Sequence, residues 1–409
     1  MKRIMQGWRR WLAAWVLVGV VVAAAGAKHT AARRGDNEVH PTVEYTFGER
    51  IRFVARFSGE RALQQVTLFY RPGGSWQGTL HAAMTLAPDG TATFVHDLKK
   101  SPLPPFSTIF YWFRVRRSDG TAYTTPSFSF VLTDNRFAWQ HLSEGPFEVW
   151  WHEGDDVLAQ QVVDAAAAGL ARAENLWLAP APEHVRIYVY ADPRVLQQTL
   201  GAKGWVAGHA SPAYGALFLA LPPGPLQESE TRRLVPHELA HDLLYRQVGD
   251  AGYHNLPVWL NEGLASLTEL RPNPDYAVAL KRAAAQDRLL PLASLCDTFP
   301  NDASDALLAY AEATSFTAFL LHRYGRNALH TLVAAYGQGV DCESGVQHVL
   351  GRSLWRLNRD WEATTFHRGW WYPIWEKARP WVGVFAVLLA SLFLSAWLAR
   401  RPTPSPNTP

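Results

Sequence analysis

The chain has 409 residues, which is too long for one compact core and predicts two or more domains. Hydrophobic residues make up 48% and charged residues 18%, which excludes a disordered chain. A formal net charge of +3 does not indicate a nucleic-acid-binding protein, and only 2 cysteines exclude a disulfide-dense miniprotein and a multi-zinc cysteine scaffold.

The first 27 residues have the layout of a secretory signal. Basic residues gather within positions 2–10, an uncharged apolar run follows over 11–27, and the run ends in Ala25-Gly26-Ala27. A basic start, an apolar middle and a small-residue end are typical of a signal peptide. The run is short for a membrane span, but an uncleaved anchor helix stays open. Under both interpretations the following chain is exported.

Residues 40–135 are predicted to form a β-sandwich. Short segments rich in β-branched and aromatic residues recur there, and turn sequences such as Pro72-Gly73-Gly74 and Asp119-Gly120 separate them. The clearest strand segments are 52–57, 66–70, 91–95, 109–115 and 127–131. This series of short strands indicates an immunoglobulin-like or fibronectin-like fold. We find no catalytic cluster in this region, so we expect a spacer or binding module.

A second domain is predicted over residues 145–365. Strand-like segments at 147–151, 185–190 and 214–221 accompany an alanine-rich helical segment over 155–178. After about residue 230 the chain is mostly helical, and strands followed by helices indicate an α+β domain. If the strand over 214–221 is a sheet edge, it is expected to bind a peptide as an additional strand.

The second domain contains the motif His237-Glu238-Leu239-Ala240-His241. On a helix, residues i and i+4 share one face, so both imidazoles can bind one metal ion. The intervening Glu238 can then take a proton from a water molecule on the metal. Two surface histidines on an ordinary helix are the alternative.

A zinc site for hydrolysis needs a third protein ligand and an open position for water. Glu262 lies 21 positions after His241, at the start of a second apolar helical segment, and the intervening loop can turn this helix back onto the first. Its carboxylate would complete a set of two histidines and one glutamate suited to zinc. By itself, Glu262 could instead be an acid at a helix start, where the helix dipole favours it.

Together with Trp259-Leu260-Asn261-Glu262-Gly263-Leu264-Ala265, the motif resembles the gluzincin metallopeptidases, in particular their peptidase MA-like domains. The resemblance spans roughly residues 145–365. It implies zinc at His237, His241 and Glu262, with Glu238 as general base, and a thermolysin-like active-site helix beneath a small sheet.

The resemblance also places a later family helix at about residues 310–325. A tyrosine at about this position supports the oxyanion in related aminopeptidases, which implies that role for Tyr310; packing in the core is the alternative. Asn261 and Asp242 are candidates for orienting the ligands, and for Asp242 an ordinary surface role is favoured.

The sequence departs from two related groups. Metzincins carry a third histidine six residues after the second, where this chain has Gln247, and all three methionines precede the motif, so a Met-turn is excluded. The aminopeptidase branch carries a Gly-x-Met-Glu-Asn strand that binds a free amino terminus. The corresponding strand here is predicted to be Gly215-Ala216-Leu217-Phe218-Leu219, which favours an endopeptidase.

Cys296 and Cys342 form an even pair, which can bridge in an oxidising compartment; two separate buried thiols are the alternative. Residues 381–399 contain no charge and are long enough, at about 1.5 Å per residue, to reach the roughly 30 Å of a bilayer core, so they predict a transmembrane helix. Arg400-Arg401 then predict a cytoplasmic tail over 400–409.

The sequence therefore predicts a multi-domain chain with an all-β sandwich, an α+β thermolysin-like zincin domain and a C-terminal transmembrane helix. The predicted function is a zinc endopeptidase in the cell membrane, with its body outside the cytoplasm, a peptide or protein as substrate and no nucleic-acid partner. A non-catalytic cell-surface adhesion or scaffold protein and a metallohydrolase for non-peptide substrates are the alternatives. The intact set of zinc-binding residues with Glu238 favours the peptidase.

Overall fold

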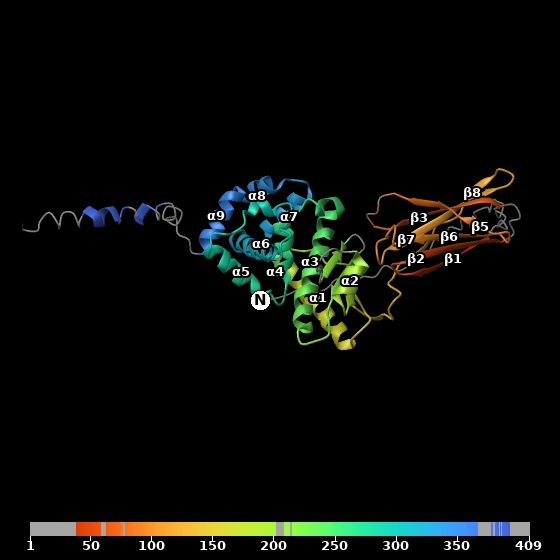
Figure 1. Ribbon diagram of the computed structural model, residues 1–409, viewed down its shortest axis with the longest axis horizontal. Helices are drawn as coiled ribbons and strands as arrows, with labels where there is room; N and C mark the ends of the chain where they lie inside the picture. The colour runs from red at the N-terminus through yellow and green to blue at the C-terminus, as the bar shows by residue number, and fades with distance from the viewer. Residues whose placement is uncertain are drawn as a thin grey trace, which may run out of the picture.

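The computed structural model describes residues 38–58, 63–74, 76, 78–201, 208–212, 215–366, 378, 381–383, 385 and 387–392. A part made of β-strands comes first along the chain, and a part with one sheet and many helices follows it (Figure 1). The predicted signal or anchor segment 1–27 and the predicted tail 400–409 lie outside the described residues.

Two antiparallel sheets form the N-terminal part. The first contains, in order, β1 (Glu38–Thr46), β2 (Arg50–Ser58), β6 (Thr91–Asp97) and β5 (Thr85–Leu86). The second contains β4 (Leu80–Ala83), β3 (Leu63–Pro72), β7 (Thr108–Arg117) and β8 (Ala122–Thr124), and β9 (Phe128–Val131) also pairs with β7. Burial alternates along β7 because successive side chains of a strand point to opposite faces.

The second part begins with a five-stranded sheet. Its order is β10 (Gln140–Glu144), β11 (Phe147–Trp151), β12 (Val185–Tyr190), β14 (Ala216–Ala220) and β13 (Gly208–Ser211). The three central strands are parallel to one another, and both outer strands are antiparallel to their neighbours. Because β13 pairs with the outer side of β14, the strand predicted over 214–221 is not a sheet edge. The edge next to the helices is β13.

Helices make up most of the second part. α1 (Asp156–Trp177) joins β11 to β12, and α2 (Pro193–Leu200) follows β12. The later elements are α3 (Gln227–Tyr253), α4 (Val258–Thr268), α5 (Pro274–Ala285), the 3-10 helix η2 (Leu292–Leu295), α6 (Ala303–Tyr324), α7 (Arg326–Gly337), α8 (Cys342–Leu350) and α9 (Leu354–Thr365). α3 is kinked at Gly249, whose φ of 75° is left-handed.

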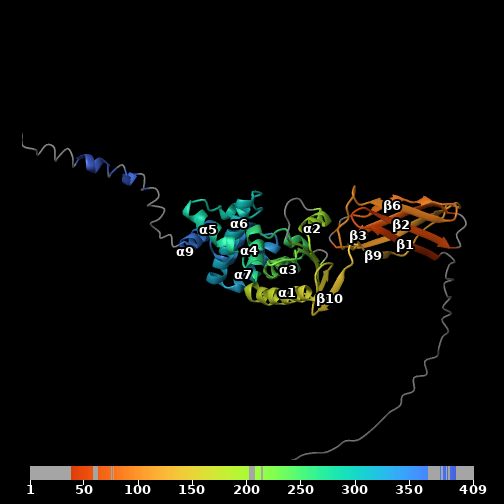
Figure 2. The same cartoon turned by 60° about the horizontal axis from the view of Figure 1, so that its bottom comes forward.

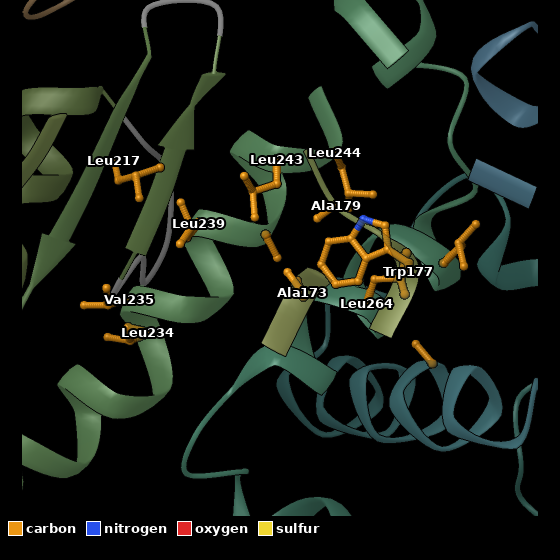
Figure 3. Close-up of a cluster of buried hydrophobic side chains, with 14 of the residues drawn as sticks. Ala173, Trp177, Ala179, Leu217, Leu234, Val235, Leu239, Leu243, Leu244 and Leu264 are labelled. Carbon is orange, nitrogen blue, oxygen red and sulfur yellow. The ribbon is translucent and has the colours of Figure 1, made fainter. Parts of the chain in front are cut away.

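A single hydrophobic core joins the sheet to α1, α3 and α4. Leu217 of β14 faces Leu239 of α3, and Trp177 at the end of α1 lies near Leu264 of α4 (Figure 3). Burial of apolar area is the main stabilising contribution here. The core therefore fixes α3 and α4 relative to each other and to the sheet.

Pro236 lies inside α3, directly before the motif. Proline has no backbone N–H, so it leaves the Arg232 carbonyl without its helical partner. The Leu270 N–H donates to that carbonyl at 2.9 Å, and the Thr268 hydroxyl donates to the Pro236 carbonyl at 3.0 Å. On the other side, a Cβ on Gly169 of α1 would collide with Pro236. The proline thus provides a contact that ties α3 to the end of α4.

The sandwich packs on the second part, as the side-by-side arrangement in Figure 2 shows. Phe106 is fully buried, and its ring centroid lies 3.9 Å from that of Tyr188 and 5.3 Å from that of Phe218. In the connection between the parts, buried Asp134 accepts a hydrogen bond from Tyr190 at 3.1 Å and pairs with Arg136 at 2.6 Å. These contacts lie on the sheet face opposite α3, because Leu217 packs toward α3 and Phe218 points the other way.

The predicted transmembrane helix over 381–399 was wrong. Within the described residues, no helix is both long and apolar enough to cross a membrane. Part of the stretch lies outside the described residues. The prediction rested on uncharged length alone, which a span requires but which does not by itself establish one.

Candidate active site

α3 places His237 and His241 on one face, with their ring centroids 5.1 Å apart. α4 brings Glu262 against them from the side. The Oε2 atom of Glu262 lies 3.4 Å from Nε2 of His237 and 3.7 Å from Nε2 of His241. One ligand atom from each of the three residues lies within 4.8 Å of the other two. The structure thus brings together three side chains from two separate segments of the chain.

The donor set fits zinc. Zinc bonds to imidazole nitrogen and carboxylate oxygen are about 2.0–2.2 Å long, so ligand atoms in a tetrahedral site lie roughly 3.3–3.5 Å apart. The buried Oε2 atom of Glu262 accepts no hydrogen bond from any described residue, which leaves it available to a cation. Two neutral imidazoles and one carboxylate leave a fourth position open, as in hydrolytic zinc sites.

The other ring nitrogens of the two histidines are held by oxygen acceptors. Nδ1 of His237 lies 3.1 Å from Oε1 of Glu269, and Nδ1 of His241 lies 2.9 Å from Oδ1 of Asn261. An oxygen acceptor at Nδ1 holds a proton on that nitrogen, which leaves Nε2, on the side of Glu262, as the nitrogen that can bind a metal ion. Asn261 therefore lies where it can orient His241. Asp242 does not orient either histidine, because its carboxylate pairs with Arg246 at 2.6 Å.

Glu269 is the residue that sequence reasoning missed. It is fully buried and directly follows α4. Its position seven residues after Glu262 corresponds to about two helical turns, so an acid at that spacing is the signal that would have pointed to it.

Electrostatics favour a positive charge between these groups. Burial alone would lower the pKa of His237, but Glu262 and Glu269 outweigh burial and raise it to about 10. Burial alone would raise the pKa of Glu262, but the two histidines outweigh burial and lower it. In a site of this kind a divalent cation takes the place of the proton.

Glu238 is buried on α3 and points toward the edge strand β13. A Cβ added to Gly208 of β13 would overlap the Glu238 carboxylate, so the glycine makes room for this side chain. The carboxylate therefore lies between the metal-binding helix and the strand whose outer edge pairs with no described strand. A substrate on that edge would pass beside it.

Tyr310 on α6 lies beside the site, with its ring centroid 6.4 Å from that of His237 and 5.0 Å from that of Phe299. Burial, together with the nearby Glu262 and Glu238, raises the pKa of Tyr310 above its ordinary value. The phenol therefore keeps its proton at neutral pH and remains a hydrogen-bond donor.

Comparisons with known proteins found one matching family model and several similar solved structures. Residues 165–367 match the peptidase MA superfamily. Among solved structures, an M1 zinc metallopeptidase from Deinococcus radiodurans is similar at 13% identity and a TM-score of 0.32, over 79% of this chain and 92% of that chain. An aminopeptidase N family protein from Idiomarina loihiensis is similar at 8% identity and a TM-score of 0.33, over 74% of this chain and 69% of that chain. No curated protein matches this chain.

Proposed function

Residues 165–367 form a gluzincin domain of the peptidase MA superfamily, and from this premise we propose that the protein is a zinc-dependent endopeptidase. The observation that carries the proposal is the convergence of Nε2 of His237, Nε2 of His241 and Oε2 of Glu262 around one point. Glu238 lies next to them and against the free edge of the sheet.

His237, His241 and Glu262 would hold the zinc ion. Bound there, zinc supplies a Lewis acid that polarises a carbonyl and lowers the pKa of water to about 7. Glu269 and Asn261 keep the two imidazoles in the orientation and tautomer that ligation requires.

Glu238 is the general base of this proposal. Its carboxylate accepts the proton of the attacking water and then passes it to the leaving amine. Tyr310 keeps its phenolic proton and donates a hydrogen bond to the oxyanion that forms on the scissile carbonyl.

The edge strand β13 is the proposed binding place for an extended peptide. A peptide that adds a strand to a free sheet edge gains main-chain hydrogen bonds. β13 reads Gly208-His209-Ala210-Ser211 and contains no carboxylate that would bind a free amino terminus. A substrate held along its backbone, with no carboxylate of β13 at its end, supports cleavage within a chain.

We also propose that the catalytic part acts outside the cytoplasm. The disulfide bond between Cys296 and Cys342 supports this, because such bonds persist in oxidising compartments. Fusions of a reporter that is active only after export test it. A reporter joined after residue 366 should be active, and an inactive reporter would contradict the location.

Metal analysis combined with a proteolysis assay tests the function. The full chain should bind one zinc ion and cleave a denatured protein, and a chelator should abolish cleavage. Glu238→Gln should keep the zinc and lose cleavage by about 10²–10⁴-fold, the size of a general-base contribution. Undiminished cleavage by this variant would exclude the mechanism. Zinc binding without cleavage of any peptide would instead favour a non-peptide substrate.

A further inference from the structure

The disulfide bond between Cys296 and Cys342 lies against the start of α4, the helix that carries Glu262. The Cys296 carbonyl accepts a hydrogen bond from the Val258 N–H at 2.8 Å. The Cys342 sulfur accepts one from Nε1 of Trp259 at 3.3 Å. Val258 and Trp259 are the first two residues of α4, so both halves of the disulfide hold the turn just before Glu262.

The start of α4 needs outside partners. The first N–H groups of a helix have no partner within it, and a Ser, Thr, Asp or Asn side chain usually supplies one. The residue before α4 is Pro257, which makes no side-chain cap. The Cys296 carbonyl therefore accepts the hydrogen bond of the Val258 N–H in place of a side-chain cap. Fully buried Trp259 is also fixed by an edge-on contact with Phe316 at 5.0 Å.

The second half of α4, from Gly263 onward, is held independently of the disulfide. Gly263 packs so closely on α6 that an added Cβ would overlap Thr317 and the Ala313 carbonyl. Beyond it, the Thr268 hydroxyl donates to the Pro236 carbonyl of α3 at 3.0 Å. Loss of the disulfide would release the N-terminal end of the helix and leave its C-terminal end in place.

We propose that the Cys296–Cys342 disulfide positions the zinc ligand Glu262, so that reduction of the disulfide weakens zinc binding while the domain stays folded. The inference rests on the proposed zinc function. Glu262 closes the first turn of α4, between the residues that the disulfide holds and the fixed Gly263, so release of this turn allows Glu262 to shift.

Both cysteines are partly exposed, so a small reductant can reach them. A water-soluble phosphine is the suitable reagent. The S–S bond breaks, each sulfur gains a proton from one water molecule, and the phosphine takes the oxygen of that water and becomes a phosphine oxide. Two electrons pass from phosphorus to the disulfide.

Zinc affinity is the measurement, made on the full chain by competition with a chromophoric chelator. We expect the reduced chain to bind zinc roughly 10–100-fold more weakly than the oxidised chain, the loss typical when a partner of a metal ligand is removed. Reoxidation should restore the affinity, and Cys296→Ser with Cys342→Ser should reproduce the reduced state. The melting curve of the metal-free chain shows in each case whether the fold persists.

Glu262→Gln tests whether the effect passes through Glu262. In this variant the remaining zinc affinity should be nearly independent of the redox state. An equal loss on reduction in the variant would mean that the disulfide acts elsewhere, and the inference would fail. Trp259→Phe keeps the disulfide and most of the ring but removes the N–H donor to the Cys342 sulfur. It should weaken zinc binding by about 2- to 5-fold, which is less than the loss from removing a direct partner of a metal ligand.

The outcomes separate the two claims. Equal zinc affinity of the oxidised and reduced chains overturns the positioning role of the disulfide and leaves the peptidase proposal intact. If the oxidised chain binds no zinc, the proposed function fails, and this inference fails with it. If the reduced chain unfolds, the zinc affinity of Trp259→Phe is the test instead. An unchanged zinc affinity in that variant overturns the inference.

Discussion

The two parts of the molecule bury different kinds of side chain. The core of the sandwich is mainly hydrophobic, with Phe53, Leu68 and Phe113 fully enclosed between its sheets, and its buried His96 is hydrogen-bonded to Tyr70. Around α3 and α4 the buried residues include His237, Glu238, His241, Asp242 and Glu269. Burial of ionisable groups is costly unless each has a partner, and here several share one position that suits a cation. The comparison places the candidate metal site in the second part of the molecule.

The largest contrast is expected from an acidic side chain in each part. Glu262→Gln should weaken zinc binding, because a neutral amide is a poorer ligand than a carboxylate. The loss should exceed the roughly 10–100-fold that follows removal of a hydrogen-bond partner of a metal ligand. Cleavage should fall with it. Glu44→Gln in the sandwich, which removes an exposed ion pair with Arg52 at 3.2 Å, is the control and should change neither. Zinc content after dialysis decides, and zinc retained by Glu262→Gln would contradict the site.

A core truncation in the sandwich should give the opposite pattern. Phe113→Ala removes a fully buried ring and should lower the free energy of unfolding of the chain by about 3–5 kcal/mol. The zinc affinity of the folded chain should stay the same, because the zinc ligands lie in the other part. Denaturant unfolding and zinc titration measure the two effects. A matching loss of zinc affinity would mean that the two parts are not separable in this way.

Glu312 should make stability depend on pH. It is fully buried on α6, one carboxyl oxygen accepts the Leu290 N–H at 2.9 Å, and the other has no hydrogen-bond partner among the described residues. Burial raises its pKa from 4.5 to about 8. In the folded chain, Glu312 therefore keeps its proton up to a higher pH than in the unfolded chain. The stability that the protonated group contributes is fully present below about pH 4.5, and up to roughly 5 kcal/mol of it is lost as pH rises through about 8.

Glu312→Gln is the matched control for this pH dependence. The amide keeps the acceptor for Leu290 and cannot ionise, so the stability of the variant should change less between pH 4.5 and pH 8 than that of the natural chain. Thermal unfolding across this range measures both proteins. If the unfolding temperatures of the two proteins changed equally with pH, Glu312 would not have the raised pKa that its burial requires.

The smallest expected effect concerns the partner of His237. Glu269→Gln keeps an oxygen acceptor near Nδ1 but removes a negative charge, and it should weaken zinc binding by roughly 10-fold. Asn135→Ala, which removes amide hydrogen bonds in the sandwich, is the control and should leave zinc affinity unchanged. Equal affinity of Glu269→Gln and the natural chain would show that the contact is not important for the metal.

The sequence predicted the features that local spacing encodes. Two histidines four residues apart must share a helix face, and alternating apolar residues must form strands such as β7. Features that depend on tertiary contacts were not predictable in this way. They include the position of β13 outside β14, the contact of Glu269 with His237 and the disulfide contact at the start of α4. Each joins segments whose proximity is decided by the shared core.

Phe106 shows the same limit within the sandwich. It adopts a φ of 57°, which residues with a Cβ rarely take, and its ring fills a site on the sheet of the second part. Local preference would place a glycine or asparagine in such a position. Packing against Tyr188 overrides that preference, and nothing in the surrounding sequence signals it.

X-ray absorption at the zinc edge, on the zinc-loaded full chain, would identify the atoms that bind the metal. We expect one zinc ion with two imidazole nitrogens at about 2.0–2.1 Å and oxygen ligands at about 2.0–2.2 Å, in a four- or five-coordinate shell. The imidazole signal should halve in His241→Ala. A shell without imidazole scattering, or one unchanged in that variant, would contradict the account.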